Sequence, residues 1–332
     1  MPTESDPAGR LGVVIKNVVP LRRDPDDDTE QVSQALLGQP MSVEGGQGDW
    51  LFVQTWDTYR GWIPSHAVRI LDDQSRPYAS TGPVAVIREL IVDVLKQPRD
   101  TSAIITKATV SDELEAIEAR GEWVELRMPD GDSGFVRKDD VRLVDRDTAH
   151  TIPLPDTRKL VETGVRFVGV PYLWGGTSPF GIDCSGLVQL IYRIHGITLL
   201  RDADIQAGDP RAEPVDRKHI RAGDLIFFGK GAQTPVFRDL SAAEVPKRTD
   251  PDTQVSVSRE LRSAVLHSVP ETPLSSITHV GMALDNKRFV HASGDLGVAI
   301  TPIDAGHPPA QYWGARRMRL ATLDPGGGVS ED

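Results

Sequence analysis

Alternating apolar and polar positions run through the first half of the chain and come in two matching sets. A short alternating segment begins at Trp50, and a second one begins at Gly61 after a polar turn. The same order returns at Trp123 and Gly134, again eleven residues apart. Because period-two alternation on both sides of a polar turn is typical of a β-hairpin, the two sets predict two copies of one hairpin-containing unit.

Each copy has room for about five strands in about 65 residues, which suits a small barrel. The pattern resembles that of bacterial SH3-like domains. We therefore expect tandem barrels near residues 10–75 and 80–146, and we place the first two domains at residues 1–77 and 78–147.

The second half of the chain changes to a helical period. A helix is expected over residues 157–164, and apolar positions after Cys184 follow helical spacing until Gly196, a suitable C-terminal stop. Strand-like segments follow at residues 224–228, 279–284 and 289–293. This order predicts an α+β domain over residues 148–322, in which a helix packs on an antiparallel sheet.

Two segments of this half do not fit the pattern. About fifty residues separate the first strand-like segment from the second, and long connections of this kind are usually functional lids or disordered loops. We place this insertion at about residues 229–276 and hypothesise that it acts as a lid. Residues 323–332 carry too little apolar content to fold and are expected to form a disordered tail.

Composition limits the partners of the protein. The 332 residues are 39% hydrophobic and 26% charged and carry a net charge of -11, which indicates a solvated acidic surface and argues against nucleic-acid binding. No segment approaches the ~18 apolar residues of a membrane span, and no secretory leader pattern is present. We therefore expect no membrane partner and a cytoplasmic location, or a secreted or periplasmic one if a leader was removed. A monomer is favoured.

Cys184 is the only cysteine in the sequence, so it has no internal disulfide partner. It lies directly before the helical pattern, where unpaired backbone N–H groups and the positive end of the helix dipole favour a thiolate. The same N–H groups can stabilise an oxyanion. Position alone makes a nucleophile plausible, and a lone cysteine is equally compatible with an inert buried position. The pair of histidines His279 and His291 favours the nucleophile.

Two histidines on consecutive strand-like segments supply a base and a residue to orient it. If Leu284 pairs with Phe289, His279 and His291 lie on opposite faces of the sheet, whereas pairing of Leu284 with Arg288 puts them on one face. We predict the second register, with a three-residue turn and a bulge. His279 then reaches the thiol, and His291 orients its imidazole.

The remaining six histidines are expected to be solvated or satisfied within the core. No Cys/His spacing fits a metal site, so no metal and no cofactor are expected. These histidines are His66, His150, His195, His219, His267 and His307.

Six short motifs follow one another in the second half of the chain. They are PYLWGG at 171–176, DCSG at 183–186, RDADIQ at 201–206, GDLIFF at 223–228, HVG at 279–281 and FVHA at 289–292. In this order they resemble the NlpC family of papain-like bacterial cell-wall cysteine peptidases. With the paired N-terminal barrels, the chain is similar, over about residues 10–320, to the subgroup that cleaves murein peptides between D-glutamate and the diamino acid.

The resemblance implies a role for each residue of the reaction. Cys184 would be the nucleophile, His279 the general base and then the general acid, and His291 the third, orienting residue. Tyr172 matches the tyrosine whose hydroxyl assists the oxyanion site, although a core aromatic with one wet end is the plain alternative.

The resemblance also implies how the substrate is held. Asp183 and Ser185 flank the nucleophile and match residues that contact the amine of the substrate, since acidic groups near the thiol are the physical means of seating an ammonium. Tyr59 and Glu30, in the first barrel, lie where further contacts are expected. A surface glutamate is the alternative for Glu30. For the RDADIQ motif, an ordinary charged surface loop is as good an explanation as a role in substrate binding or in support of the catalytic loop.

The implied activity is a cofactor-independent cysteine peptidase acting on a murein tri- or tetrapeptide with an unblocked N-terminal L-alanine. It would release meso-diaminopimelate or L-lysine from L-alanyl-γ-D-glutamate in cell-wall peptide recycling. Two alternatives stay open. A cell-wall amidase, acyltransferase or endopeptidase acting on intact peptidoglycan would tolerate a blocked amine, and a non-catalytic wall-binding protein would show no turnover.

Overall fold

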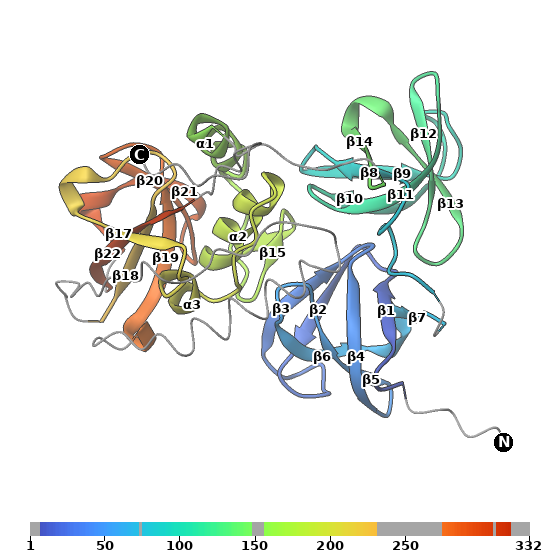
Figure 1. The fold of residues 1–332 in the computed structure, drawn as a ribbon, viewed down its shortest axis with the longest axis horizontal. Coiled ribbons are helices and arrows are strands. Elements are labelled where there is room, and N and C mark those ends of the chain that lie inside the picture. The colour runs from blue at the N-terminus through green and yellow to red at the C-terminus, as the bar shows by residue number, and fades with distance from the viewer. Residues whose placement is uncertain (1–6, 73–74, 148–155, 231–273, 308–309, 320–332) are drawn as a thin grey trace, which may run out of the picture.

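The computed structural model describes residues 7–72, 75–147, 156–230, 274–307 and 310–319 (Figure 1). Two barrels are followed by a third domain whose helices lie between its sheet and the barrels. The expected α+β class, a helix packed on an antiparallel sheet after two small barrels, is confirmed. Most of the expected insertion at 229–276 and the expected tail at 323–332 lie outside the described residues.

The first barrel is built from seven antiparallel strand segments around an apolar core. They are β1 (Leu11–Val14), β2 (Val18–Arg22), β3 (Gln31–Leu36), β4 (Pro40–Gln47), β5 (Trp50–Gln54), β6 (Arg60–Pro64) and β7 (Val68–Ile70). They pair in the order β3-β2-β6-β5-β4-β1-β7. Alternate residues of β5, Leu51 and Val53, point into the core, which explains why period-two alternation predicted this region.

The second barrel repeats this arrangement. Its strands are β8 (Pro83–Ile87), β9 (Ile91–Leu95), β10 (Ile104–Thr109), β11 (Glu113–Arg120), β12 (Trp123–Arg127), β13 (Ser133–Arg137) and β14 (Val141–Asp145). Their order, β10-β9-β13-β12-β11-β8-β14, matches the first barrel strand by strand. Counterparts are 73 residues apart, as from Gln31 to Ile104 and from Trp50 to Trp123. Each sheet has seven segments where about five were expected. In the first barrel, β1 and β7 have only four and three residues, which is too short to show a pattern.

A glycine shared by the two hairpins has a steric reason. A Cβ added at Gly61 would lie 3.1 Å from the Cβ of Leu21, and one added at Gly134 would lie 2.6 Å from Val94. Leu21 and Val94 hold equivalent positions on β2 and β9. The second strand of each hairpin therefore crosses the same neighbour at the same point, and only glycine permits so close an approach.

The third domain contains a six-stranded antiparallel sheet in the order β17-β22-β18-β19-β20-β21. Its elements are α1 (Thr157–Arg166), β15 (Thr177–Ser178), β16 (Gly181–Ile182), α2 (Cys184–Ile194), α3 (Ala203–Ala207), β17 (Ala212–Val215), β18 (Leu225–Gly229), β19 (Ile277–Ala283), β20 (Arg288–Ser293), β21 (Gly297–Pro302) and β22 (Gln311–Met318), with short 3-10 turns at Arg217–His219, Leu274–Ser276 and Ile303–Ala305. No helix among the described residues is long and apolar enough to cross a bilayer.

The helix α2 begins at Cys184 and packs on this sheet. Asp183 caps it, because its carboxylate accepts a hydrogen bond from the backbone N–H of Gly186 at 2.7 Å. Leu187 and Ile191, one turn apart, belong to the core that the helix shares with β19 and β20. The helix ends just before Gly196, whose φ of 73° provides the expected left-handed stop.

The β19–β20 hairpin adopts the predicted register. The N–H of Leu284 donates to the carbonyl of Arg288 at 2.9 Å, so residues 285–287 form a three-residue turn. His279 and His291 therefore share a face of the sheet. The predicted bulge is absent from the paired residues of this hairpin, because the odd-numbered turn alone sets the parity. An irregularity occurs instead between β18 and β19.

Candidate active site

Cys184 occupies the first turn of α2, beside β19. Burial raises the pKa of its thiol to about 12, and the Asp183 carboxylate acts in the same direction. Hydrogen bonds from the backbone N–H groups of Val280 and Ser185 lower the pKa, but by less. The N–H of Ser185 at the helix terminus thus favours the thiolate, as expected, but desolvation of the sulfur outweighs this effect and keeps the resting thiol protonated. The bond to Val280 also places the nucleophile next to the strand residue adjoining His279.

His279, His291 and Thr301 form a hydrogen-bonded row. His279 Nε2 lies 2.9 Å from His291 Nδ1, and His291 Nε2 lies 2.9 Å from Thr301 Oγ1. For His279 to accept a proton at Nδ1, its Nε2–H must donate to His291, and the Nε2–H of His291 must then donate to Thr301. Thr301 lies on β21 opposite Phe289, and no sequence motif marks it.

Aromatic rings enclose the two imidazoles. Phe289 stacks on His291 with ring centroids 4.5 Å apart, and the ring of Phe228 lies 6.0 Å from that of His279. Burial, followed by the neighbouring histidines, holds the pKa of His279 well below its usual value. Burial, followed by His307, lowers the pKa of His291 to about 4. Both rings are therefore neutral near pH 7, and His279 can act as a base.

His307 also belongs to this cluster, a neighbourhood that its sequence context did not indicate. Its ring stacks on His279, with centroids 3.7 Å apart and planes 13° apart. A bridge between His307 and Ala310 ends the loop that carries it there. Nitrogen atoms of His279, His291 and His307 lie within 4.8 Å of one another. Because a metal cannot lie in both of two stacked ring planes, this arrangement suits packing better than coordination.

Tyr172 lies beside the nucleophile through a bridge to Ile182, two residues before Cys184. Burial raises the pKa of its phenol to about 12, and the charges of Cys184 and Asp183 add to this effect. The hydroxyl therefore stays protonated at neutral pH, which keeps it able to donate a hydrogen bond.

The carboxylate of Asp183 is engaged by protein donors on both oxygens. Oδ1 accepts from the N–H of Gly186, from Ser185 Oγ at 3.2 Å and from Arg201 at 3.0 Å, while Oδ2 accepts from the N–H of Gly175 at 3.0 Å and from Arg201. A carboxylate has about four acceptor positions. Arg201 is only 2% exposed, so the interpretation of its motif as a charged surface loop is wrong. This buried pair holds the loop before Cys184 in place.

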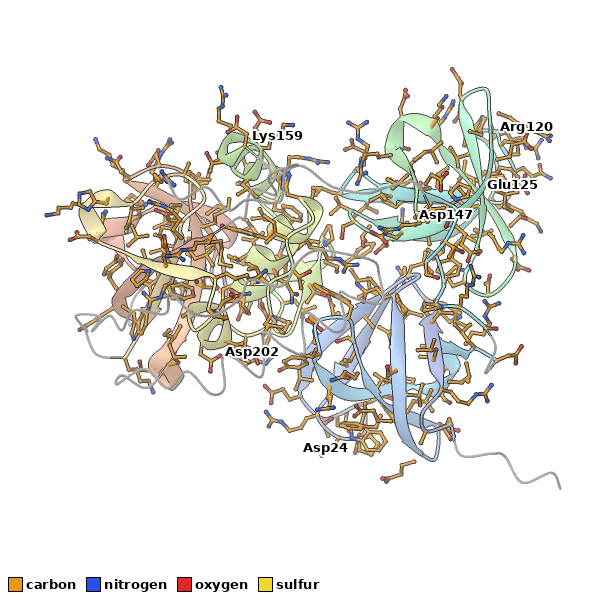
Figure 2. All side chains as sticks on the ribbon, in the orientation of Figure 1. Asp24, Arg120, Glu125, Asp147, Lys159 and Asp202 are labelled. Carbon is orange, nitrogen blue, oxygen red and sulfur yellow. The ribbon has the colours of Figure 1, made fainter. Side chains whose placement is uncertain are left out.

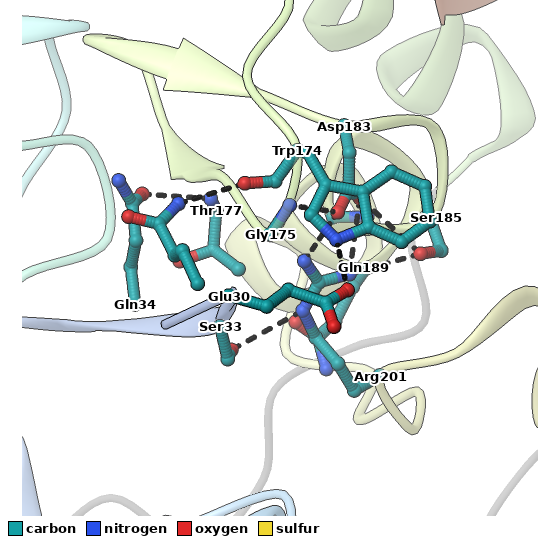
Figure 3. Close-up of polar contacts among 12 residues, drawn as sticks. Glu30, Ser33, Gln34, Trp174, Gly175, Thr177, Asp183, Ser185, Gln189 and Arg201 are labelled. Atoms are coloured by element: carbon teal, nitrogen blue, oxygen red, sulfur yellow. Dashed lines mark hydrogen bonds and ion pairs between the residues drawn. The ribbon is translucent and has the colours of Figure 1, made fainter. Parts of the chain in front are cut away.

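The first barrel is joined to that loop through β3 and the residue before it (Figure 3). The indole N–H of Trp174 donates to Glu30 at 2.8 Å, and Gln31 donates to the carbonyl of Trp174 at 2.8 Å. The N–H of Thr177 donates to Gln34 at 2.8 Å. Three successive contacts therefore fix residues 174–177 against the barrel, a few residues before the nucleophile.

A second part of the barrel rests on α2 itself. Gln189 of α2 donates to Asp57 at 2.9 Å, and the other oxygen of Asp57 accepts from the N–H of Tyr59 at 3.3 Å. Arg201 also reaches the barrel, donating to Ser33 at 3.2 Å. Tyr59 thus lies on a turn that is fixed to the nucleophile's helix. Gln189 was not singled out in the sequence, because a polar residue in a helical pattern gives no signal of its partner.

Comparison with known proteins gives separate matches for the third domain and for the first barrel. The profile of the NlpC/P60 family matches residues 169–236, and that of the bacterial dipeptidyl-peptidase SH3 domain matches residues 21–68. The chain is 31% identical over 223 residues to dipeptidyl-peptidase 6 of Lysinibacillus sphaericus, across 65% of this chain and 80% of that protein. The chain belongs to the NlpC/P60 family. Members of this family are cysteine peptidases, so the NlpC/P60 assignment agrees with the enzyme class expected from Cys184 and the two histidines.

A second relative and a solved structure are also similar to this NlpC/P60 chain. It is 32% identical over 223 residues to the γ-D-glutamyl-L-lysine dipeptidyl-peptidase of Bacillus cereus, with 60% of this chain matching 62% of that protein. A crystal structure of an NlpC/P60 family protein from Bacillus cereus superimposes with a TM-score of 0.69, covering 93% of this chain and 99% of that one at 22% identity. The NlpC/P60 fold is thus shared across all three domains.

Proposed function

We propose that this protein is a dipeptidyl-peptidase that cleaves the bond between γ-D-glutamate and the diamino acid in short murein peptides with an unblocked N-terminal L-alanine. The names of its Bacillus and Lysinibacillus relatives support peptidase activity of this kind. The observation that carries the specificity is the attachment of β3 to residues 174–177. In this proposal, a barrel fixed beside the nucleophile closes one end of the substrate groove to a peptide chain that continues beyond its first residues.

The first step is attack by the Cys184 sulfur on the γ-carbonyl carbon of D-glutamate. Because both the thiol and His279 are neutral at rest, the thiol proton moves to Nδ1 of His279 as the carbon–sulfur bond forms. His291 accepts from the opposite nitrogen of His279 and stabilises the imidazolium. The protonated phenol of Tyr172 donates to the oxyanion.

The second step releases the amine of the diamino acid. His279 returns its proton to the departing nitrogen, which leaves L-alanyl-γ-D-glutamate as a thioester on Cys184. Water, deprotonated by the same imidazole, then hydrolyses the thioester and regenerates the thiol.

Recognition of the substrate ammonium is assigned chiefly to Glu30. The acceptor positions of the Asp183 carboxylate are occupied by protein donors. Glu30, in contrast, accepts one hydrogen bond, from Trp174, and forms an ion pair with Arg23. Acceptor positions of Glu30 are thus left for an ammonium group. Tyr59 and Ser185 complete the proposed subsite.

The test compares L-Ala-γ-D-Glu-meso-diaminopimelate with its N-acetylated form. The unblocked peptide should be cleaved and the acetylated one should not, because the acetyl group removes the charge and adds bulk. Cys184→Ala should abolish turnover. Glu30→Gln should raise KM about tenfold or more with a smaller effect on kcat.

Glu44→Gln is the matched control, since Glu44 forms an ion pair with Arg60 on the same barrel. Equal cleavage of both peptides would reject amine recognition and favour an endopeptidase of intact wall. Turnover by the Cys184→Ala variant would reject the mechanism. The recycling role and the cytoplasmic location stay predictions, and both meso-diaminopimelate and L-lysine stay candidates for the diamino acid.

A further inference from the structure

A cavity of about 520 Å³ lies where the two barrels and the third domain meet. The first barrel contributes residues 38–42 and 54–56, the second barrel 86–88, 110–111 and 113, and the third domain 193–198. The cavity adjoins the C-terminal end of α2. Since this helix has 11 residues, its first residue, Cys184, is about 15 Å away along the axis. The cavity is therefore separate from the proposed peptidase site.

Positive charge is concentrated in this cavity, although the whole chain carries a net charge of -11. Glu113 is the only carboxylate among the lining residues, against five guanidinium groups. These belong to Arg88, Arg142, Arg146, Arg166 and Arg193.

Only two of these arginines have an ionic partner within the described parts of the chain. Arg146 pairs with Glu113, and Arg166 pairs with Glu89 at 3.1 Å. The other three side chains make no hydrogen bond or ion pair with any described residue. A local excess of cations on an acidic protein indicates an anionic occupant.

Arg193 carries the argument furthest, because its guanidinium is held in place without a direct ion pair among the described residues. It lies 4.5 Å from the ring centroid of Trp56, in a cation–π contact. Burial lowers its pKa, while the carboxylates of Glu113, Asp112 and Asp57 act in the opposite direction from beyond hydrogen-bond distance. A partly buried cation without a direct partner gains from a ligand that supplies one.

We propose that this junction cavity binds a small organic anion, whose charged group pairs with Arg193 and whose apolar body lies against Trp56 and Met41. The volume matches that of ordinary small-molecule sites. Because the walls come from all three domains, a bound anion stabilises their arrangement, including the attachment of β3 to residues 174–177. The site does not overlap with the proposed peptide subsites.

The probe for this site is 8-anilinonaphthalene-1-sulfonate, which combines one negative charge with an apolar body of suitable size. In a fluorescence titration of the full chain, we expect one saturable site. Arg193→Gln should weaken binding at least tenfold. N-phenyl-1-naphthylamine, which lacks the sulfonate, should bind at least tenfold more weakly to the unmodified protein.

Arg120→Gln is the control, since Arg120 pairs with Glu118 on the part of the second barrel that faces away from the third domain (Figure 2). Affinity unchanged by Arg193→Gln, or competition between the probe and the peptide substrate, would overturn the proposal. If thermal melting shows that Arg193→Gln does not fold, the comparison of the two probes on the unmodified protein decides. Equal affinities for the probe with and without the sulfonate would overturn the proposal.

Discussion

A single hydroxyl on β21 decides which nitrogen of the catalytic base is available. Replacing Thr301 by valine removes the acceptor for the Nε2–H of His291. The favoured tautomer of His291 then carries its proton on Nδ1 and donates it to His279 Nε2. His279 then carries its own proton on Nδ1, facing the thiol, and can no longer accept one. We expect kcat to fall about tenfold or more with KM little changed.

Thr301→Ser is the matched variant, because it keeps the hydroxyl and loses only a methyl group. It should retain kcat within about twofold. Steady-state kinetics on the unblocked tripeptide give both constants. A valine variant as active as the serine variant would show that the hydroxyl does not set the proton positions.

The low pKa of His291 makes stability depend on pH. The folded value is about 4 and the ordinary value is 6.5, so the unfolded chain binds the proton first as pH falls. Stability is therefore complete above pH 6.5 and is lost as pH falls toward 4, by about 3 kcal/mol from this residue. Denaturant unfolding at several pH values should show this slope.

His291→Gln should flatten the slope between pH 4 and 6.5, although part remains because the pKa of His279 is also lowered. His219→Gln is the control, since His219 is exposed. An unchanged slope in the His291 variant would contradict the burial argument.

The roles of individual residues could be predicted from the sequence where those residues lie in a recognisable motif. Cys184 and Tyr172 lie together at the start of α2, and His279 and His291 share a face, as the spacing and register required. Thr301 and His307 could not be foreseen, because each reaches the site through the pairing or folding of a separate segment. Arg201 was ambiguous, since charge alone does not reveal whether a side chain is buried.

Between elements, the contact of β3 with residues 174–177 depends on Gly175. Its φ is 72°, and a Cβ there would lie 2.6 Å from the carbonyl oxygen of Gln31. Gly175→Ala should push the loop away from the barrel and lower kcat/KM for the unblocked tripeptide by about tenfold or more.

Gly48→Ala separates backbone strain from this displacement. Gly48 also has a positive φ, 56°, but an added Cβ there has no atom within 4 Å. Both variants should lose roughly 1 kcal/mol of stability, measured by denaturant unfolding, while only the Gly175 variant should lose activity. Equal kinetics in the two would show that the contact does not matter.

Element order was largely readable from the sequence, and contacts between elements were not. Hydrophobic periodicity located α2 and the hairpins, and the parity of one turn fixed the β19–β20 register. The strands β1 and β7 of the first barrel are too short to show periodicity. The attachment of Gln34 to Thr177 joins residues 143 positions apart, and no local pattern encodes such a distance.

At the scale of the whole molecule, the first barrel contributes directly to the surroundings of the nucleophile. It contacts the loop before Cys184 through β3 and the helix behind it through Asp57. The second barrel meets the others chiefly around the junction cavity. The three domains thus enclose two separate places for ligands, one at each end of α2.

The two barrels have the same strand order and a constant offset, as expected for a duplicated unit. Their sequences differ at some positions and agree at others. Trp50 and Gly61 recur as Trp123 and Gly134, which marks them as requirements of the barrel itself. Where β3 has Gln31 and Gln34, the other copy has Ile104 and Lys107, which cannot make the same contacts.

Gln31 and Gln34 thus occupy positions that the barrel fold leaves open and that serve a contact in one copy only. Tyr59 and Glu30, whose counterparts are Asp132 and Ala103, also differ between the copies. The second barrel thus serves as an internal reference for the first. Replacing Gln31 and Gln34 by their counterparts Ile and Lys should remove the contacts with residues 174–177 while keeping the barrel fold.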